Sequence, residues 1–178
     1  MDTKTTLIIG GCRSGKSRMA IDLANRYSAS EKKIFIATCI PLDTEMQARV
    51  QKHKDERDNL WQTFEIPVHL SQAIRENSPN ADVILIDCVT LWINNLLMET
   101  LDNKTISDYI QGLVNALDAA CCPVIIVSNE VGAGIVPENN LARLFRDYAG
   151  FANQQIAKHV QKVVWMVAGI PVTIKASS

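Results

Sequence analysis

Short runs of apolar, mostly β-branched residues recur along the chain, and longer amphipathic stretches separate them. The runs are continuous rather than alternating with polar residues, which is typical of strands buried on both faces of a parallel sheet. They cover residues 6–9, 33–37, 83–87, 124–127 and 163–167. The pattern predicts an α/β fold with a mostly parallel sheet flanked by helices.

The clearest helical pattern runs from about Asn140 to Gln161, after Pro137 and the Asn139–Asn140 pair, which favour a helix start. This predicted helix carries one apolar stripe, made of Leu141, Leu144, Phe145, Tyr148, Ala152, Ile156 and Val160. After it, residues 172–174 predict a final edge strand paired with the apolar run 163–167.

Composition narrows the class of protein. The 178 residues correspond to roughly one domain, spanning 1–178. Hydrophobic residues make up 47% and charged residues 21% of the chain, a composition that argues against disorder. The formal net charge of −1 argues against nucleic-acid binding. The longest stretch without acidic or basic residues, 163–174, is shorter than the roughly 20 residues of a membrane span. Five cysteines without a C-x-x-C pair predict a reduced, cytoplasmic protein.

A phosphate-binding loop follows the first predicted strand. Residues 10–17 match G-x-x-x-x-G-K-[ST], and a helix-forming stretch, 17–27, follows. The glycines let backbone N–H groups face a phosphate at the positive end of the helix dipole. Lys16 is expected to reach the β- and γ-phosphates, and Ser17 is expected to ligate Mg²⁺.

The predicted strand 83–87 ends in a carboxylate, which is the Walker B form. Because the carboxyl end of such a strand lies beside the phosphate loop, Asp87 is expected to hold Mg²⁺ together with Ser17. Capping of the next helix by Asp87 is the alternative. The chain has no N-K-x-D motif, so it does not resemble a switch GTPase.

A strongly polar helix is predicted over Asp43–Asp58, with His53 on the stripe of its few apolar residues. Arg49 and Arg57 lie four positions to either side of His53, so their charge should keep the imidazole neutral, and they could hold phosphate. A neutral imidazole suits a nucleophile or base. A satisfied or merely exposed histidine is the alternative.

Other positions have weaker signals. Glu65 follows a short strand and is either solvated or functional. Residues 129–137 follow a buried strand, and their two glycines and one carboxylate suggest a substrate loop, with a plain connection as the alternative. His69 and His159 are assigned to structural roles.

Taken together and in this order, these motifs resemble the bifunctional adenosylcobinamide kinase / adenosylcobinamide-phosphate guanylyltransferase family of cobalamin biosynthesis, over nearly the whole chain. The matching segments are residues 10–17, Ala37-Thr38, Asp43-x-Glu45-Met46 with Arg49 and His53-Lys54, Trp61-x-Thr63-x-Glu65-x-Pro67, Asp87-Cys88-x-Thr90-Leu91-Trp92, residues 129–137, Phe145-Arg146-Asp147 and Asn153-Gln154.

The resemblance implies a RecA-like P-loop NTPase that forms a homotrimer and catalyses two reactions. ATP or GTP phosphorylates adenosylcobinamide, and GMP from GTP then passes through a guanylyl-histidine intermediate to that phosphate, giving adenosylcobinamide-GDP. By the same resemblance His53 is the guanylylated residue, and His53 and Lys16 are catalytic. The implied nucleotide contacts are Gly10, Gly11, Cys12, Arg13, Ser14, Gly15, Lys16, Ser17, Ala37, Thr38, Cys39, His53, Lys54, Asp55, Glu56, Glu65 and Asp87.

Two rival interpretations belong to other classes. One is a small-molecule P-loop kinase without a guanylyltransferase step, and the other is a non-catalytic nucleotide-binding module. Covalent labelling of the protein by α-labelled GTP is expected only for the bifunctional enzyme. The motifs do not choose between ATP and GTP as phosphate donor and do not identify the base of the kinase reaction.

Overall fold

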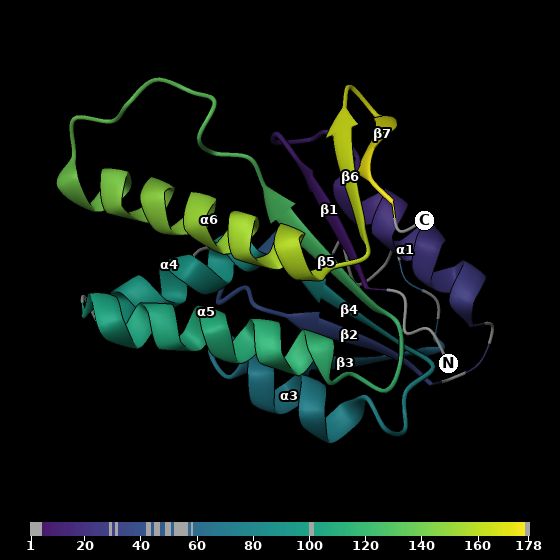
Figure 1. Cartoon of the computed structure of the whole chain (residues 1–178). Helices are drawn as coiled ribbons and strands as arrows, with labels where there is room; N and C mark the ends of the chain where they lie inside the picture. The colour runs from purple at the N-terminus through teal and green to yellow at the C-terminus, as the bar shows by residue number, and fades with distance from the viewer. Residues whose placement is uncertain are drawn as a thin grey trace.

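The computed structural model describes residues 5–28, 30, 32–41, 44, 47, 48, 51, 57, 59–99 and 102–176. Their strands form one seven-stranded sheet in the order β3-β2-β4-β5-β1-β6-β7, parallel except for the β6–β7 pair (Figure 1). The mostly parallel sheet and the final edge strand are therefore confirmed. The strands are β1 Thr6–Gly10, β2 Lys33–Ala37, β3 Trp61–Glu65, β4 Val83–Asp87, β5 Val124–Asn129, β6 Lys162–Val167 and β7 Ile170–Lys175.

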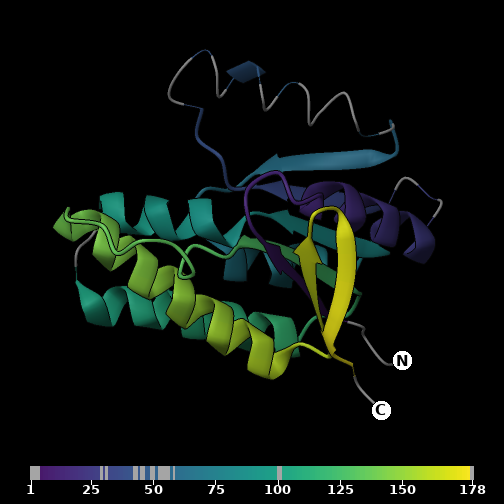
Figure 2. The same cartoon turned by 90° about the horizontal axis from the view of Figure 1, so that it is seen from above.

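Helices cover both faces of the sheet. Successive residues of a strand point to opposite faces, and in the buried strands both sets of side chains are apolar. Strand residues such as Ile8, Leu85 and Ile125 pack with Ala20 and Ala24 of α1, Lys16–Tyr27. Their sequence neighbours pack on the other face against the four remaining labelled helices (Figures 1 and 2). Those helices are α3 Leu70–Asn77, α4 Val89–Glu99, α5 Asn103–Asp118 and α6 Asn140–His159.

Helix α6 begins where the sequence predicts. The Asn139 side chain caps it by accepting a hydrogen bond from the backbone N–H of Ala142, at 3.1 Å. The helix ends at His159 rather than Gln161, because Val160 is already extended and leads into β6. Leu141, predicted on the buried stripe, is 40% exposed, because the first turn of α6 lies beyond the ends of the strands (Figure 1).

The predicted polar helix over residues 43–58 falls largely outside the described residues, within which Thr44, Gln47, Ala48 and Gln51 are helical. Among the helices that the structure describes, none combines the length and the apolar character needed to cross a bilayer. The parallel strands β1 to β6 all end at the same edge of the sheet, and this edge positions the predicted site residues.

Candidate active site

The phosphate loop leaves β1 at Gly10 and enters α1 at Lys16. Arg13 and Gly15 have positive φ angles of 53° and 91°, and at Gly15 this turn leads directly into the helix. A side chain at Gly10 would place its Cβ 2.5 Å from the backbone carbonyl oxygen of Met166 in β6. The loop is therefore packed against the neighbouring strand, and only glycine fits at its first position.

Lys16 lies inside this loop, with 7% of its surface exposed. Its Nζ donates to the carbonyl oxygen of Gly11 at 2.5 Å and to Oγ of Ser14 at 3.4 Å. Burial lowers the pKa of Lys16 from its usual value, while the Asp87 carboxylate acts in the opposite direction. The acceptors of the ammonium group are neutral, and an anionic phosphate oxygen would be a stronger partner for it.

Ser17 and Asp87 meet across the edge of the sheet. The Ser17 hydroxyl, in the first turn of α1, donates to Oδ2 of Asp87 at the end of β4, at 2.7 Å. Both side chains are partly exposed. The structure thus brings together the hydroxyl and the carboxylate that were predicted to share a magnesium ion, and two adjacent hard oxygen ligands suit that ion.

The ends of β2 and β3 continue the same edge. In the strand register, Ala37 lies between Asp87 of β4 and Glu65 of β3. Burial raises the pKa of the half-buried Cys39 thiol, and the Asp87 and Glu65 carboxylates raise it further. The structure therefore groups Ala37, Cys39 and Glu65 with Asp87, and their contact with a nucleotide stays a prediction.

Thr38 is placed differently from these neighbours. Its side chain is 0% exposed, and its hydroxyl both donates to the carbonyl oxygen and accepts from the N–H of Cys88, each at 2.8 Å. Asn95 of α4 donates to the carbonyl oxygens of Thr38 and Pro67, at 2.8 and 2.9 Å. Thr38 and Asn95 therefore hold the strand ends together. Because the Thr38 hydroxyl is bonded to Cys88, the predicted contact of Thr38 with a nucleotide would come from its backbone.

The segment 129–137 begins directly beside the phosphate loop. The Glu130 backbone N–H donates to the carbonyl oxygen of Gly10 at 3.1 Å, and its Oε1 accepts from the N–H of Gly132 at 2.6 Å. Arg146 of α6 donates to the carbonyl oxygen of Gly132 at 2.5 Å. The sequence marked this segment but not its contact with Gly10, which depends on the order of the strands.

The turn between β6 and β7 also touches the phosphate loop, a contact that the sequence does not predict. Ala168 and Gly169 form this turn with φ angles of 50° and 82°. The Gly169 N–H donates to the carbonyl oxygen of Ser14 at 3.2 Å. The glycine just before the last predicted strand was the only local signal for the turn, and nothing local indicated its partner.

The predicted nucleophile and its neighbours, residues 53–56, lie outside the described residues, as does Arg49. Arg57 is described, and its guanidinium carbon lies 3.7 Å from the centroid of the Phe35 ring. The Arg57 side chain thus stacks on the face of the sheet that α1 covers.

The two other histidines make contacts that agree with structural roles. Nδ1 of His159 lies 2.9 Å from Oδ2 of Asp118, which joins the last turns of α6 and α5. The His69 ring, at the start of α3, lies 6.1 Å from the ring of Tyr109 in α5.

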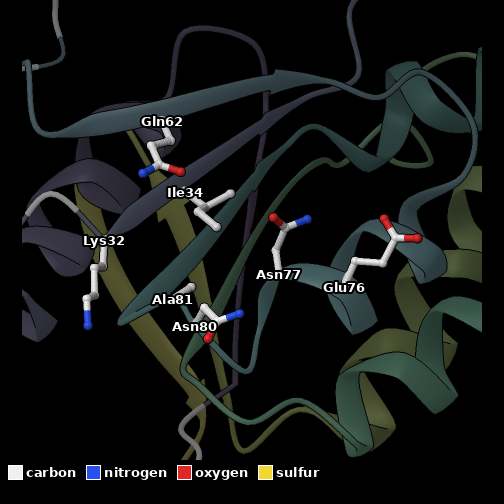
Figure 3. A pocket seen from close by; sticks show the side chains of 7 residues that line it. All are labelled: Lys32, Ile34, Gln62, Glu76, Asn77, Asn80 and Ala81. Carbon is white, nitrogen blue, oxygen red and sulfur yellow. The ribbon is translucent and has the colours of Figure 1, made fainter.

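A pocket of about 270 Å³ lies at the opposite edge of the sheet (Figure 3). Its lining residues come from the start of β2, from β3 and from around the end of α3: Lys32, Ile34, Gln62, Glu76, Asn77, Asn80 and Ala81. The phosphate loop and Asp87 lie at the carboxyl ends of the strands, so this pocket is not part of the candidate active site.

Nearly the whole chain matches proteins of known family. Residues 6–174 match the family model described as cobinamide kinase / cobinamide phosphate guanyltransferase. The bifunctional adenosylcobalamin biosynthesis proteins CobU of Salmonella typhimurium and Escherichia coli are 43% and 41% identical, over 95% of this chain and 98% of each relative. CobP of Pseudomonas aeruginosa, with the same description, is 37% identical over 95% of this chain and 96% of its own.

Among solved structures, the flagellar accessory protein FlaH from Methanocaldococcus jannaschii is similar, with a TM-score of 0.53 and 15% identity over 98% of this chain and 79% of that one. At this identity the likeness concerns the fold alone. The family model and the three curated relatives, by contrast, span the sheet, the phosphate loop and Asp87. The chain therefore belongs to the cobinamide kinase / cobinamide phosphate guanyltransferase family.

Proposed function

We propose that this chain catalyses both reactions for which its family is named. ATP or GTP phosphorylates the hydroxyl of adenosylcobinamide, and GMP from GTP is then joined to that phosphate to give adenosylcobinamide-GDP. The observation that carries the proposal is the meeting of Lys16, Ser17 and Asp87 at the phosphate loop of a chain in this family. One nucleotide site serves both reactions.

Magnesium belongs to this proposed site. Ser17 and Asp87 would hold the ion, since their side-chain oxygens are already adjacent and are the hard ligands it prefers. When bound, Mg²⁺ neutralises the negative charge of the phosphates.

In the kinase reaction the residues of the loop supply positioning and charge. Phosphoryl transfer depends on both more than on covalent chemistry. Lys16 would exchange its bonds to Gly11 and Ser14 for bonds to the β- and γ-phosphates. Arg13, exposed on the same loop, offers a second cation to the transferred group.

In the guanylyltransferase reaction His53 is the proposed nucleophile. Its imidazole nitrogen forms a bond to the α-phosphorus of GTP as the bond to pyrophosphate breaks, and the phosphate of the corrinoid then displaces His53. The match of His53 to the guanylylated histidine of the family supports this role. The remaining proposed nucleotide contacts are Gly10, Gly11, Cys12, Ser14, Gly15, Ala37, Thr38, Cys39, Lys54, Asp55, Glu56 and Glu65. Of these, Ala37, Cys39 and Glu65 lie in one group with Asp87.

The proposal extends to a cytoplasmic homotrimer. Exposed apolar side chains on the last two strands, among them Trp165 and Ile170 at 45% and 65% exposure, support self-association. All five cysteines are free thiols, which agrees with a reducing compartment.

Incubation with α-labelled GTP and Mg²⁺ tests the function. The protein should acquire a label that is labile to acid and stable to base, as a phosphoramidate is, and γ-labelled GTP should leave no such mark. His53→Asn should abolish the label and the formation of adenosylcobinamide-GDP while keeping most of the kinase activity. His69→Asn is the matched control and should label normally.

Each rival interpretation has its own outcome in this experiment. Corrinoid phosphorylation without any covalent label would indicate a kinase alone. Nucleotide binding with neither reaction would indicate a binding module. A label that persists in His53→Asn would move the nucleophile to another residue.

A further inference from the structure

Glu130 is a carboxylate of the sheet edge with no role in the binding of nucleotide proposed above. It follows β5, which lies between β1, the strand of the phosphate loop, and β4, the strand of Asp87. Asn129 pairs in register with Gly10, and the Glu130 N–H donates to the Gly10 carbonyl oxygen at 3.1 Å. The backbone of Glu130 is thus bonded to the first residue of the phosphate loop.

The side chain of Glu130 is held by one oxygen only. Oε1 accepts the N–H of Gly132 at 2.6 Å, whereas no described residue donates to Oε2 or forms an ion pair with this carboxylate. A Cβ at Gly132 would lie 2.8 Å from Oε1, so the glycine makes room for the carboxylate. Arg146 fixes the same turn through the Gly132 carbonyl oxygen. The result is an oriented, partly exposed carboxylate whose second oxygen accepts no hydrogen bond from the described residues.

The other carboxylates of this edge are less suited to meet an acceptor hydroxyl. Asp87 accepts the Ser17 hydroxyl and is assigned to magnesium. Glu65 lies on β3, which three strands separate from β1. An acceptor hydroxyl must approach the γ-phosphate in line, from the side opposite the β-phosphate. In the proposed site the β-phosphate would bind at the start of α1. The acceptor would then enter beside the carboxyl ends of the strands next to the loop, and Glu130 directly follows one of them, β5.

We propose that Glu130 is the general base of the kinase reaction, an inference that rests on the proposed function. Oε2 accepts the proton of the corrinoid hydroxyl as the hydroxyl oxygen forms its bond to the γ-phosphorus. The bond between the γ-phosphorus and the bridging oxygen breaks, and the nucleoside diphosphate leaves with that oxygen. Guanylyl transfer needs no such base, because its acceptor is already an anionic phosphate.

Glu130→Gln tests this role, because the amide oxygen can still accept the Gly132 N–H while the base is lost. Single-turnover phosphorylation of adenosylcobinamide should fall roughly a hundredfold or more. The dissociation constant of MgGTP and the rate of covalent labelling by α-labelled GTP should stay within about twofold of wild type, because neither nucleotide binding nor guanylyl transfer uses this base. Gly132→Ala, which displaces the carboxylate without removing it, should lower the kinase rate in the same selective way.

Glu138→Gln is the matched control, because Glu138 is an exposed glutamate directly after the segment 129–137, and both activities of this variant should match wild type. Wild-type kinase activity in Glu130→Gln would overturn the assignment. Equal loss of kinase and labelling would also overturn it, since Glu130 would then only brace the phosphate loop. Absence of kinase activity in the wild-type protein would instead contradict the proposed function itself.

Discussion

Lys16 is the buried cation of the phosphate loop, and its loss should affect both proposed reactions. In Lys16→Ala, a charge-assisted contact to the phosphates disappears in each transition state. The loss should amount to about 3 kcal/mol, or roughly a hundredfold or more in rate. Rates of corrinoid phosphorylation and of labelling by α-labelled GTP, measured on the same folded preparation, check this expectation.

Lys32→Ala is the control for this experiment, because Lys32 is an exposed lysine at the opposite edge of the sheet. Its removal should leave both rates unchanged. If Lys16→Ala removed one activity and left the other at the wild-type rate, the protein would need two separate nucleotide sites.

At the scale of elements, the end of β1 packs against β6, so substitution of the two adjacent glycines Gly10 and Gly11 should affect stability differently. Gly10→Ala would push a methyl group to 2.5 Å from the Met166 carbonyl oxygen, whereas a Cβ at Gly11 meets nothing within 4 Å. Overpacking of this kind costs about 2 kcal/mol, which corresponds to a melting temperature lowered by roughly 4–8 °C. Gly11→Ala should melt near wild type. Thermal unfolding followed by circular dichroism compares them, and equal melting temperatures would contradict this account of Gly10.

Elements with local signals could be predicted from the sequence. Continuous apolar runs indicated the buried parallel strands, and the G-x-x-x-x-G-K-S motif indicated a loop between a strand and a helix. The pairing of Ser17 with Asp87 followed, because both residues lie at the carboxyl edge that parallel strands share. These inferences required no knowledge of the strand order.

Contacts that depend on strand order or register could not be predicted in this way. The hydrogen bond from the Glu130 N–H to Gly10 exists because β5 is a neighbour of β1. An apolar run in the sequence does not indicate which strand it will pair with. The Gly169 turn meets Ser14 because β6, which leads into this turn, is the other neighbour of β1. The Thr38 side chain is turned inward to the Cys88 peptide, which the family motif alone did not reveal.

At the scale of the whole molecule, the candidate active site and an exposed apolar surface lie on different parts of the sheet. The carboxyl edge carries the phosphate loop and its carboxylates, while the β6–β7 hairpin forms one side of the sheet (Figure 2). Residues directly opposite in an antiparallel pair share a face, and here Trp165 opposes Val172 while Val167 opposes Ile170. All four are at least 44% exposed, so one apolar face of the hairpin lies open in the single chain.

This hairpin face is expected to be covered by other copies of the chain in the proposed trimer. Ile170→Glu would bury an unpaired carboxylate in that interface, which is costly, while in the single chain the side chain is 65% exposed. Size-exclusion chromatography with light scattering should therefore give three chains for the wild type and one for the folded variant. Met98→Glu is the matched control, because Met98 on α4 is equally exposed at 65% and lies outside the hairpin. A trimer that survives Ile170→Glu would place the interface elsewhere, and a monomeric wild type would refute the trimer itself.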